Sequence, residues 1–325
     1  MGENSKLKIE NDSKSSFSIF IPTYGRDVSL KGSIDSIIKY WQEKDIDNII
    51  ISDNNENDTA FNVIDKLKYD KINYIKNATN IGIDRNLLRF LDLCTSRYCW
   101  LLGDDDRLNE NSFKLVHPFL DKELDFILLL SQDNNNYQTG IYTIDNNNSA
   151  NKLFINLWDK ITFGNLIVNV TIANKLRKDD PEVFNKYIGT SHAYCVIWEM
   201  LISIYSSGKF AIICENAVDK IDVAKSWSSS FLEVHLMHPR IWYKTMPQKY
   251  EEAREIVYKK YLAEIGAFRL IASYAKYIHI NKHKKKDVFN YIEDFPLILK
   301  IKMKVMFFMY PCLAFLKKQL NAVLK

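Results

Sequence analysis

Short apolar runs alternate with segments of helical spacing in the first hundred residues, and this restricts the fold more than any other feature. The runs with the length and composition of buried strands are residues 17–21, 48–52, 72–75 and 98–102. Between them, apolar residues recur three or four positions apart, as on one face of a helix. Strands made of continuous apolar runs are covered on both faces. The pattern therefore predicts an α/β domain with a mostly parallel sheet flanked by helices.

Beyond residue 107 the pattern is weaker but continues. We expect further strands at 123–131 and 163–168 and an apolar helix at 189–206. Asn-rich stretches around residues 133–136 and 145–148 are typical of loops. From about residue 235 the spacing is helical, most clearly at 251–277, which predicts a helical C-terminal extension.

Three consecutive aspartates, Asp104, Asp105 and Asp106, directly follow the fourth apolar run. An isolated acidic triplet is most often a solvated turn. In an open parallel sheet, however, ligands bind at the carboxyl ends of the strands. Mg²⁺ and Mn²⁺ are held there by one or two carboxylates together with substrate phosphates. Asp104 and Asp106, one residue apart, therefore form a candidate site for a divalent metal and a diphosphate, and Asp105 between them is a further candidate nucleotide contact.

Two other strand ends carry side chains suited to a nucleotide. Pro22, Thr23, Tyr24 and Arg26 follow the first run and offer a fixed turn, an aromatic face for a base and a cation for phosphate. Asp53 follows the second run and could accept the imide N–H of a pyrimidine. Each also has an ordinary interpretation, as a turn sequence and as a turn-forming aspartate.

A fourth polar segment, residues 80–86, lies between the third strand and a helix. Asn80 or Asn86 could simply cap that helix. The functional interpretation places Asp84, Arg85 and the neighbouring backbone near the nucleotide, because helix N-termini bind phosphate.

Together these segments resemble the family 2 glycosyltransferases of GT-A fold, which have a Rossmann-like sheet, and most closely the abequosyltransferase or O-antigen-type branch. The resemblance rests on Pro22-Thr23-Tyr24, Ser52-Asp53-Asn54-Asn55, Asn80-Ile81-Gly82 with Asn86, and Asp104-Asp105-Asp106. It covers residues 17 to about 230. It implies nucleotide contacts at Thr23, Tyr24 and Asp53, contact with ribose or diphosphate at Asp104, and ligation of Mn²⁺ or Mg²⁺ by Asp106.

The sequence departs from the family at the general base. In the family this base is often a carboxylate at the start of a helix late in the domain. The matching position holds His192, which is a competent base near neutral pH but could equally be a capping or satisfied polar residue. Glu199 is the rival, although its place beside Trp198 in an apolar helix favours a packing role. Lys225 lies in a segment that matches the family's loop over the diphosphate, and we expect it to contact phosphate.

The resemblance and the charge distribution together suggest the domain organisation. We expect a flexible leader (1–16), a catalytic domain (17–232) with a nucleotide-binding half (17–107) and an acceptor-binding half (108–232), and a basic helical region (233–325). Residues 231–325 hold 18 Lys or Arg against 8 Asp or Glu, whereas residues 1–230 hold 26 against 32. A net charge of +4 gives no reason to expect nucleic acid as a partner.

The basic region is also the candidate membrane contact. Its segment around residues 303–316 combines apolar residues with flanking lysines, which fits either a helix packed on the domain and kinked at Pro311 or an interfacial helix on anionic lipid. The polar first sixteen residues predict no secretory signal, and no apolar run reaches the eighteen residues of a membrane span. The five cysteines form no C-x-x-C pair and are typical of buried thiols in a reducing compartment. We expect a cytoplasmic protein, peripheral on the membrane.

The sequence thus predicts a metal-dependent inverting glycosyltransferase. It would move a sugar from a UDP- or other nucleoside-diphosphate sugar to a glycan or lipid-linked acceptor in surface polysaccharide synthesis. Two alternatives stay open. An inactive GT-A scaffold could bind a nucleotide or a partner at the membrane, since the acidic base is missing. A sugar nucleotidylyltransferase is also α/β and metal-dependent, but the first strand end carries only Gly25 where a glycine-rich loop is needed.

Overall fold

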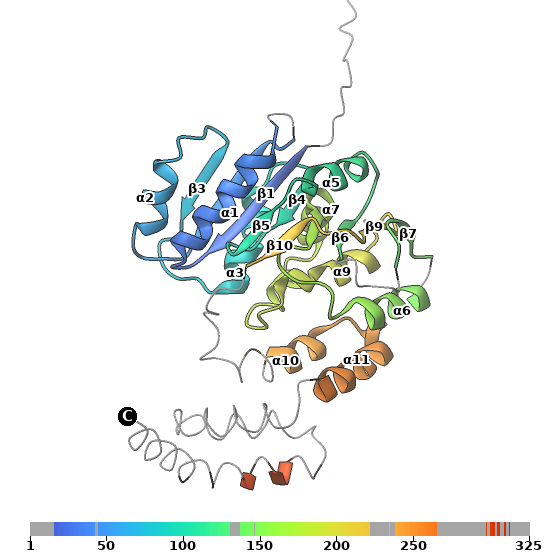
Figure 1. Ribbon diagram of the computed structural model, residues 1–325. Helices are drawn as coiled ribbons and strands as arrows, with labels where there is room; N and C mark the ends of the chain where they lie inside the picture. The colour runs from blue at the N-terminus through green and yellow to red at the C-terminus, as the bar shows by residue number, and fades with distance from the viewer. Residues whose placement is uncertain are drawn as a thin grey trace, which may run out of the picture.

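The computed structural model describes residues 16–42, 45–130, 137–145, 147–221 and 238–264, together with Val234 and a few single positions between 297 and 312. Its centre is an eight-stranded sheet with the order β3-β2-β1-β4-β8-β6-β9-β7 (Figure 1). The first four strands in this order are mutually parallel, whereas β8 and β7 run antiparallel to their neighbours. The strands are β1 (Phe17–Thr23), β2 (Asn48–Asp53), β3 (Ile72–Lys76), β4 (Tyr98–Leu101), β6 (Phe126–Leu129), β7 (Gly140–Thr143), β8 (Leu166–Asn169) and β9 (Lys209–Ile213).

Helices cover both faces of this sheet. They are α1 (Asp27–Tyr40), α2 (Thr59–Asp65), α3 (Ile83–Leu88), α4 (Phe90–Leu93), α5 (Ser112–Leu120), α6 (Asn147–Leu157), α7 (Val170–Asp179), α8 (Glu182–Asn185), α9 (Ile197–Ile202), α10 (His238–Thr245) and α11 (Glu251–Glu264), with short 3-10 turns η1 (Ala193–Val196) and η4 (Gln248–Tyr250). Alternate residues of each strand enter opposite cores, as the two-residue period of a strand requires. Ile19 and Ile49 pack with α1, α2 and α5, whereas Phe20 and Ile50 pack with α3, α4, α6, α7 and α9.

A small second sheet lies beside the carboxyl end of β4. It pairs β5 (Asp106–Leu108) antiparallel with β10 (Val218–Lys220), so that Asp106 lies opposite Lys220. The acidic turn therefore leads directly into a second strand and is fixed at both ends. This arrangement brings residues more than a hundred positions apart to the same edge of the main sheet.

The predicted strands at 17–21, 48–52, 72–75, 98–102, 123–131 and 163–168 correspond to β1, β2, β3, β4, β6 and β8. β1 does not stop before Pro22 but continues to Thr23, because a parallel partner strand satisfies the remaining backbone groups. The predicted helix at 189–206 is wrong in extent. Gly189 and Ser191 have φ of +89° and +56°, so this segment begins with a turn and becomes helical only at η1 and α9. The expected loop around 145–148 is also partly wrong, since α6 begins at Asn147.

The helices beyond residue 237 belong to the same core as the sheet. α10 and α11 pack beside α6 (Figure 1), and buried Trp242, Tyr250 and Val257 join the cluster that contains Trp198. The predicted boundary at residue 232 lies outside the described residues. The cysteines are free thiols, but only Cys94, Cys99 and Cys195 are buried, whereas Cys312 is exposed. Within the described part of the chain, no helix combines the length and hydropathy needed to cross a membrane.

Candidate functional site

Three of the predicted residues meet where β1, β2 and β4 end. Thr23 is in register with Asp53 on the neighbouring parallel strand, and β4 pairs with the other edge of β1. The Thr23 hydroxyl donates a hydrogen bond of 2.7 Å to Asp104 Oδ2. Thr23, Asp53 and Asp104 are all buried. The parallel register thus gathers side chains from three separate sequence segments at one sheet edge, as we expected.

Arg26 and Tyr24 form the outer part of this edge. The Arg26 guanidinium bridges Asp104 and Asp105, with a distance of 2.8 Å from Nη1 to Asp105 Oδ2. Tyr24 lies between the buried Thr23 and this cation, and 55% of it is exposed. Burial raises the pKa of Asp104 to about 6, against the opposing effect of Arg26. An exposed ring and a partly exposed cation that both follow β1 are suited to a base and its phosphates.

Asp53 is held as a hydrogen-bond acceptor. Its Oδ1 accepts from the backbone N–H of Asn55 at 2.8 Å, and its Oδ2 accepts from the Tyr74 hydroxyl at 2.9 Å. Burial, and then the hydrogen bond to Asp53, raise the pKa of Tyr74, so the phenol stays a donor. The carboxylate therefore has a fixed orientation, but each of its oxygens already has one partner.

Asp106 is buried in a space that glycines leave for it. Its Oδ2 accepts from the Gly103 N–H at 2.9 Å, and a side chain at Gly164 would overlap the carboxylate. Burial raises the pKa of Asp106 to about 6, although the Gly103 hydrogen bond and the charge of Lys220 oppose that rise. The nearby cations therefore do not fully offset the effect of burial on this carboxyl group.

These donors fit a divalent metal that also binds phosphate. The two buried carboxyl groups of Asp104 and Asp106 have raised pKa values, which a dication beside them would lower. In the described residues no three His, Cys, Asp or Glu side chains cluster as a metal site. Mg²⁺ and Mn²⁺ commonly take one or two protein carboxylates and complete their coordination with phosphate and water, which fits the pair Asp104 and Asp106.

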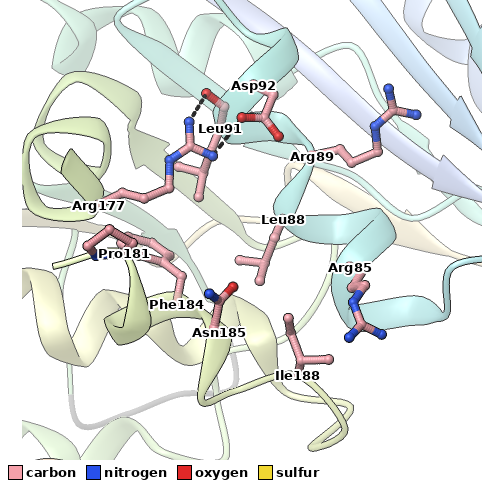
Figure 2. Close-up of a pocket in the computed structure, with 10 residues that line it drawn as sticks. All are labelled: Arg85, Leu88, Arg89, Leu91, Asp92, Arg177, Pro181, Phe184, Asn185 and Ile188. Carbon is pink, nitrogen blue, oxygen red and sulfur yellow. Dashed lines mark hydrogen bonds and ion pairs between the residues drawn. The ribbon is translucent and has the colours of Figure 1, made fainter.

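Asp84 and Arg85 point in different directions from α3. The Asp84 carboxylate is buried and accepts three backbone N–H bonds from residues 189–193. Arg85 is exposed and lines a pocket of about 200 Å³ with Arg89 and Arg177 (Figure 2). None of the aspartates at the sheet edge lines that pocket. The nucleotide contacts of Asp84 and Arg85 stay predictions, and the structure gives the Asp84 carboxylate another set of partners.

His192 lies in the turn that Asp84 holds. Its Nδ1 is 2.6 Å from the Thr190 carbonyl oxygen, and its ring stacks on Trp242 with centroids 5.3 Å apart and planes at 15°. Burial lowers the pKa of His192, so the ring is neutral near pH 7. Glu199 accepts a hydrogen bond of 2.5 Å from Tyr187 and pairs with Lys186 at 2.5 Å, which agrees with the packing role predicted for it.

Ring contacts connect His192 with the acidic turn. His192 contacts Tyr194 at a centroid distance of 5.8 Å, and Tyr194 contacts Phe163 at 5.4 Å. The next residue, Gly164, lies against Asp106. The two halves of the predicted site are therefore parts of one packed region. Lys225, the predicted phosphate contact, lies outside the described residues.

The sequence did not reveal several residues that shape the site. Asn77 and Asn86 bridge Ser52 and Asn54 below Asp53, and the buried Trp242 comes from a helix far along the chain. Asn86 was noted as a possible cap and as part of the family motif, but not for this role, and Asn77 carried no signal. Trp242 carried no signal, since an aromatic residue in a helical pattern is usually part of the core.

Comparison with known proteins agrees with this geometry. Residues 18–176 match the model of the glycosyl transferase family 2. The chain is 30% identical over 209 residues to abequosyltransferase RfbV of Salmonella typhimurium. This match covers 58% of the chain and 61% of the length of RfbV.

Solved structures share the fold at much lower identity. TarS of S. aureus in complex with UDP-GlcNAc has a TM-score of 0.52 at 12% identity, over 81% of this chain and 80% of that chain. The mannosyltransferase PcManGT of Pyrobaculum calidifontis in complex with GDP-Man and Mn²⁺ has a TM-score of 0.50 at 12% identity, over 90% and 84% of the two chains. The expected GT-A fold is thus confirmed, and the part of the chain that matches is similar to glycosyl transferase family 2 and to an abequosyltransferase, as the sequence motifs suggested.

Proposed function

We propose that the chain is an inverting glycosyltransferase that moves a sugar from a nucleoside-diphosphate sugar to a glycan or lipid-linked acceptor in surface polysaccharide synthesis. The observation that carries this proposal is the convergence of Thr23, Asp53 and Asp104 beside the buried Asp106. The relative RfbV is named an abequosyltransferase, which supports this activity over a nucleotidylyltransferase or an inactive scaffold.

Each of these side chains in the donor half of the site would have a role in binding the nucleotide sugar. The exposed Tyr24 ring would stack on the base, and the fixed Asp53 acceptor would select its hydrogen-bonding edge. Asp104, oriented by Thr23 and Arg26, would face ribose and diphosphate. Arg85 and Lys225 are further candidate phosphate contacts. Asp106 would hold Mn²⁺ or Mg²⁺, which supplies charge neutralisation for the departing diphosphate.

The acceptor half depends on His192. Its imidazole would take the proton of the acceptor hydroxyl as that oxygen forms its bond to the anomeric carbon. The bond from the anomeric carbon to the diphosphate oxygen breaks on the opposite side, and the nucleoside diphosphate leaves with the electron pair. The lowered pKa of His192 supports this role, because the ring is already neutral when the acceptor binds.

Hydrolysis of donors tests the function without knowledge of the acceptor. The purified chain is incubated with UDP-, GDP-, CDP- and dTDP-sugars in Mn²⁺ or Mg²⁺, and release of nucleoside diphosphate is followed. We expect slow release from one class of nucleotide, abolished by a chelator. Failure of every donor to bind or react with either metal would contradict the proposal.

Two variants separate the halves of the mechanism. Asp106→Ala should abolish metal-dependent release, and a fully active Asp106→Ala protein would rule out its metal role. His192→Ala should leave acceptor-independent release of nucleoside diphosphate intact while lowering acceptor-dependent transfer by about 10²–10⁴-fold. A His192→Ala rate equal to that of the unaltered chain across neutral pH would assign the base to another residue.

We further propose that the C-terminal region contacts an anionic membrane surface, where a lipid-linked acceptor would be found. Leu297, Ile301, Val305 and Met309 are helical, exposed and four positions apart, and the exposed Lys302 lies among them. Such an apolar stripe next to cations is typical of interfacial helices. We expect the chain to sediment with vesicles that contain anionic lipid, but not with neutral ones, and Ile301→Asp to weaken this binding. Equal recovery with both kinds of vesicle would contradict an electrostatic contribution.

A further inference from the structure

The turn that carries His192 has a backbone that needs outside support. Gly189 has φ of +89°, which glycine tolerates, but Ser191 has φ of +56° in the left-handed region. A non-glycine residue there is strained and persists only where its surroundings fix it. The turn has no long helix of its own, since η1 begins only at Ala193.

Asp84 supplies that support from the other half of the domain. Its Oδ2 accepts from the N–H groups of Gly189 and Ser191 at 2.8 and 2.9 Å, and its Oδ1 accepts from Ala193 at 3.1 Å. The residue is 5% exposed. A buried carboxylate with three N–H donors is a strong, oriented anchor. The three donors surround His192 in sequence.

The ring of His192 is fixed on further sides. Its Nδ1 lies 2.6 Å from the Thr190 carbonyl oxygen, and Trp242 of α10 covers one face. A carbonyl oxygen only accepts, so Nδ1 carries the proton of this bond. In the neutral ring the lone pair is then on Nε2, the nitrogen available to take a proton.

We infer that Asp84 is a positioning residue that holds the turn Gly189–Ala193, and with Trp242 presents the His192 imidazole with Nε2 unprotonated. This inference rests on the proposed function for its catalytic meaning. It also assigns Asp84 to the acceptor half of the site, although Asp84 belongs to the nucleotide-binding half by sequence. Helix α3 would thereby connect the sheet edge proposed to bind the sugar donor with His192, the proposed general base.

The charges around the ring predict the direction in which the pKa of His192 should change when Asp84 is replaced. Burial lowers the pKa of His192, the negative charge of Asp84 raises it, and His238 from α10 lowers it. Tyr194, on the 3-10 turn that follows, contacts the His192 ring, and burial raises its pKa so that it stays neutral. Removal of the Asp84 charge should therefore lower the pKa of His192 further.

Nitrogen NMR on the full-length chain with ¹⁵N-labelled histidine tests the tautomer directly. Among six histidines, the His192 signal is the one absent from His192→Gln. We expect a neutral ring near pH 7 with Nδ1 protonated and Nε2 unprotonated. The opposite tautomer would overturn the inference, and this measurement needs no altered Asp84.

The same spectra recorded against pH test Asp84. We expect Asp84→Asn to lower the pKa of His192 by about 0.5–1 unit, because an opposite charge near an imidazole favours its protonated form. Asp92→Asn is the matched control, since Asp92 is on the adjacent α4, 61% of its side chain is exposed and it pairs with Arg177. The control should leave His192 unchanged. An unchanged or raised pKa in Asp84→Asn would overturn the inference.

The kinetic readout separates this inference from the proposed function. With an acceptor, Asp84→Asn should lower kcat and shift its pH profile in the same direction as the NMR pKa. If the pKa shift occurs but no donor reacts in the unaltered chain, the positioning role stands and the proposed reaction fails. If donors react but the pKa of His192 does not move, the reaction stands and the positioning role fails.

Discussion

Burial of the Asp106 carboxylate lowers the stability of the folded chain when no metal ion is bound. Its pKa is raised by burial from 3.8 to about 6, so the folded chain binds this proton more tightly than the unfolded chain. Stability should therefore fall as the pH rises from about 4 to 6, and the full cost is present above pH 6. We predict that Asp106→Asn stabilises the metal-free protein by about 1–3 kcal/mol at pH 7.5 but not at pH 4. Urea unfolding at both pH values measures this.

Asp105→Asn is the control for that prediction. Asp105 is the partly exposed member of the triplet and pairs with Arg26, so its replacement should change stability by at most about 1 kcal/mol. Mn²⁺ with a nucleoside diphosphate should stabilise the unaltered protein and Asp105→Asn, but not Asp106→Asn. Equal stabilisation of all three proteins would remove Asp106 as the metal ligand.

Gly164 is the residue that makes room for this carboxylate. It has φ of +87°, and a methyl group there would overlap Asp106 Oδ2. We predict that Gly164→Ala lowers stability by about 1–3 kcal/mol, through backbone strain and displacement of Asp106, and weakens metal binding. Gly140→Ala is the control, because a methyl group at Gly140 meets no atom within 4 Å. Thermal unfolding of both variants, with and without Mn²⁺, compares them.

Residues at strand ends were the part of the site that sequence could predict. Thr23, Asp53 and Asp104 follow apolar runs, and the parallel register brings them together. The role of Asp84 was not predictable in the same way. Its partners are backbone N–H groups more than a hundred positions away, and backbone donors leave no mark in a sequence.

At the scale of elements, hydrogen bonds attach α3 to β2 beside the sheet edge where β1, β2 and β4 end, which is the proposed donor site. Buried Asn86 of α3 accepts from Ser52 Oγ at 2.6 Å and donates to the Ser52 carbonyl oxygen at 3.0 Å. We predict that Asn86→Ala destabilises the protein by about 1–3 kcal/mol, because it leaves buried polar partners unsatisfied. Chemical denaturation measures this. Asn80→Ala should stay within about 0.5 kcal/mol, since the exposed Asn80 bonds only within its own loop, and equal losses would contradict the argument.

Element length explains which helices and strands were predictable. β1 to β4 are four to seven residues long, contain at least three apolar residues each and were confirmed, whereas β5 and β10 have three residues each and polar sequences. Short edge strands obtain their stability from pairing with a partner and not from their own pattern. The turn before η1 was assigned to the helix that follows it, although residues 189–192 are Gly-Thr-Ser-His and its left-handed residues are held by Asp84.

At the scale of the whole molecule, α10 and α11 complete the core on one face of the sheet. The buried residues that they, η4 and the link after α10 contribute are Trp242, Tyr243, Met246, Tyr250, Ala253 and Val257. Phe154 and Trp198 contact several of their rings. Burial of a large apolar side chain is worth about 1.5–3 kcal/mol, so these contacts together match the 5–15 kcal/mol by which a typical domain is stable.

A chain that ends at residue 232 should therefore lose cooperative folding, although it keeps the complete sheet and every aspartate of the site. A chain that ends at Glu264 retains α10 and α11 and should keep its unfolding transition, since the described residues beyond it, such as Leu297 and Ile301, are exposed. Circular dichroism against temperature and tryptophan fluorescence in urea compare the two chains with the full one. If the chain ending at 232 unfolds with an unchanged midpoint, the sheet is stable alone, and α10 serves only to place Trp242 against His192.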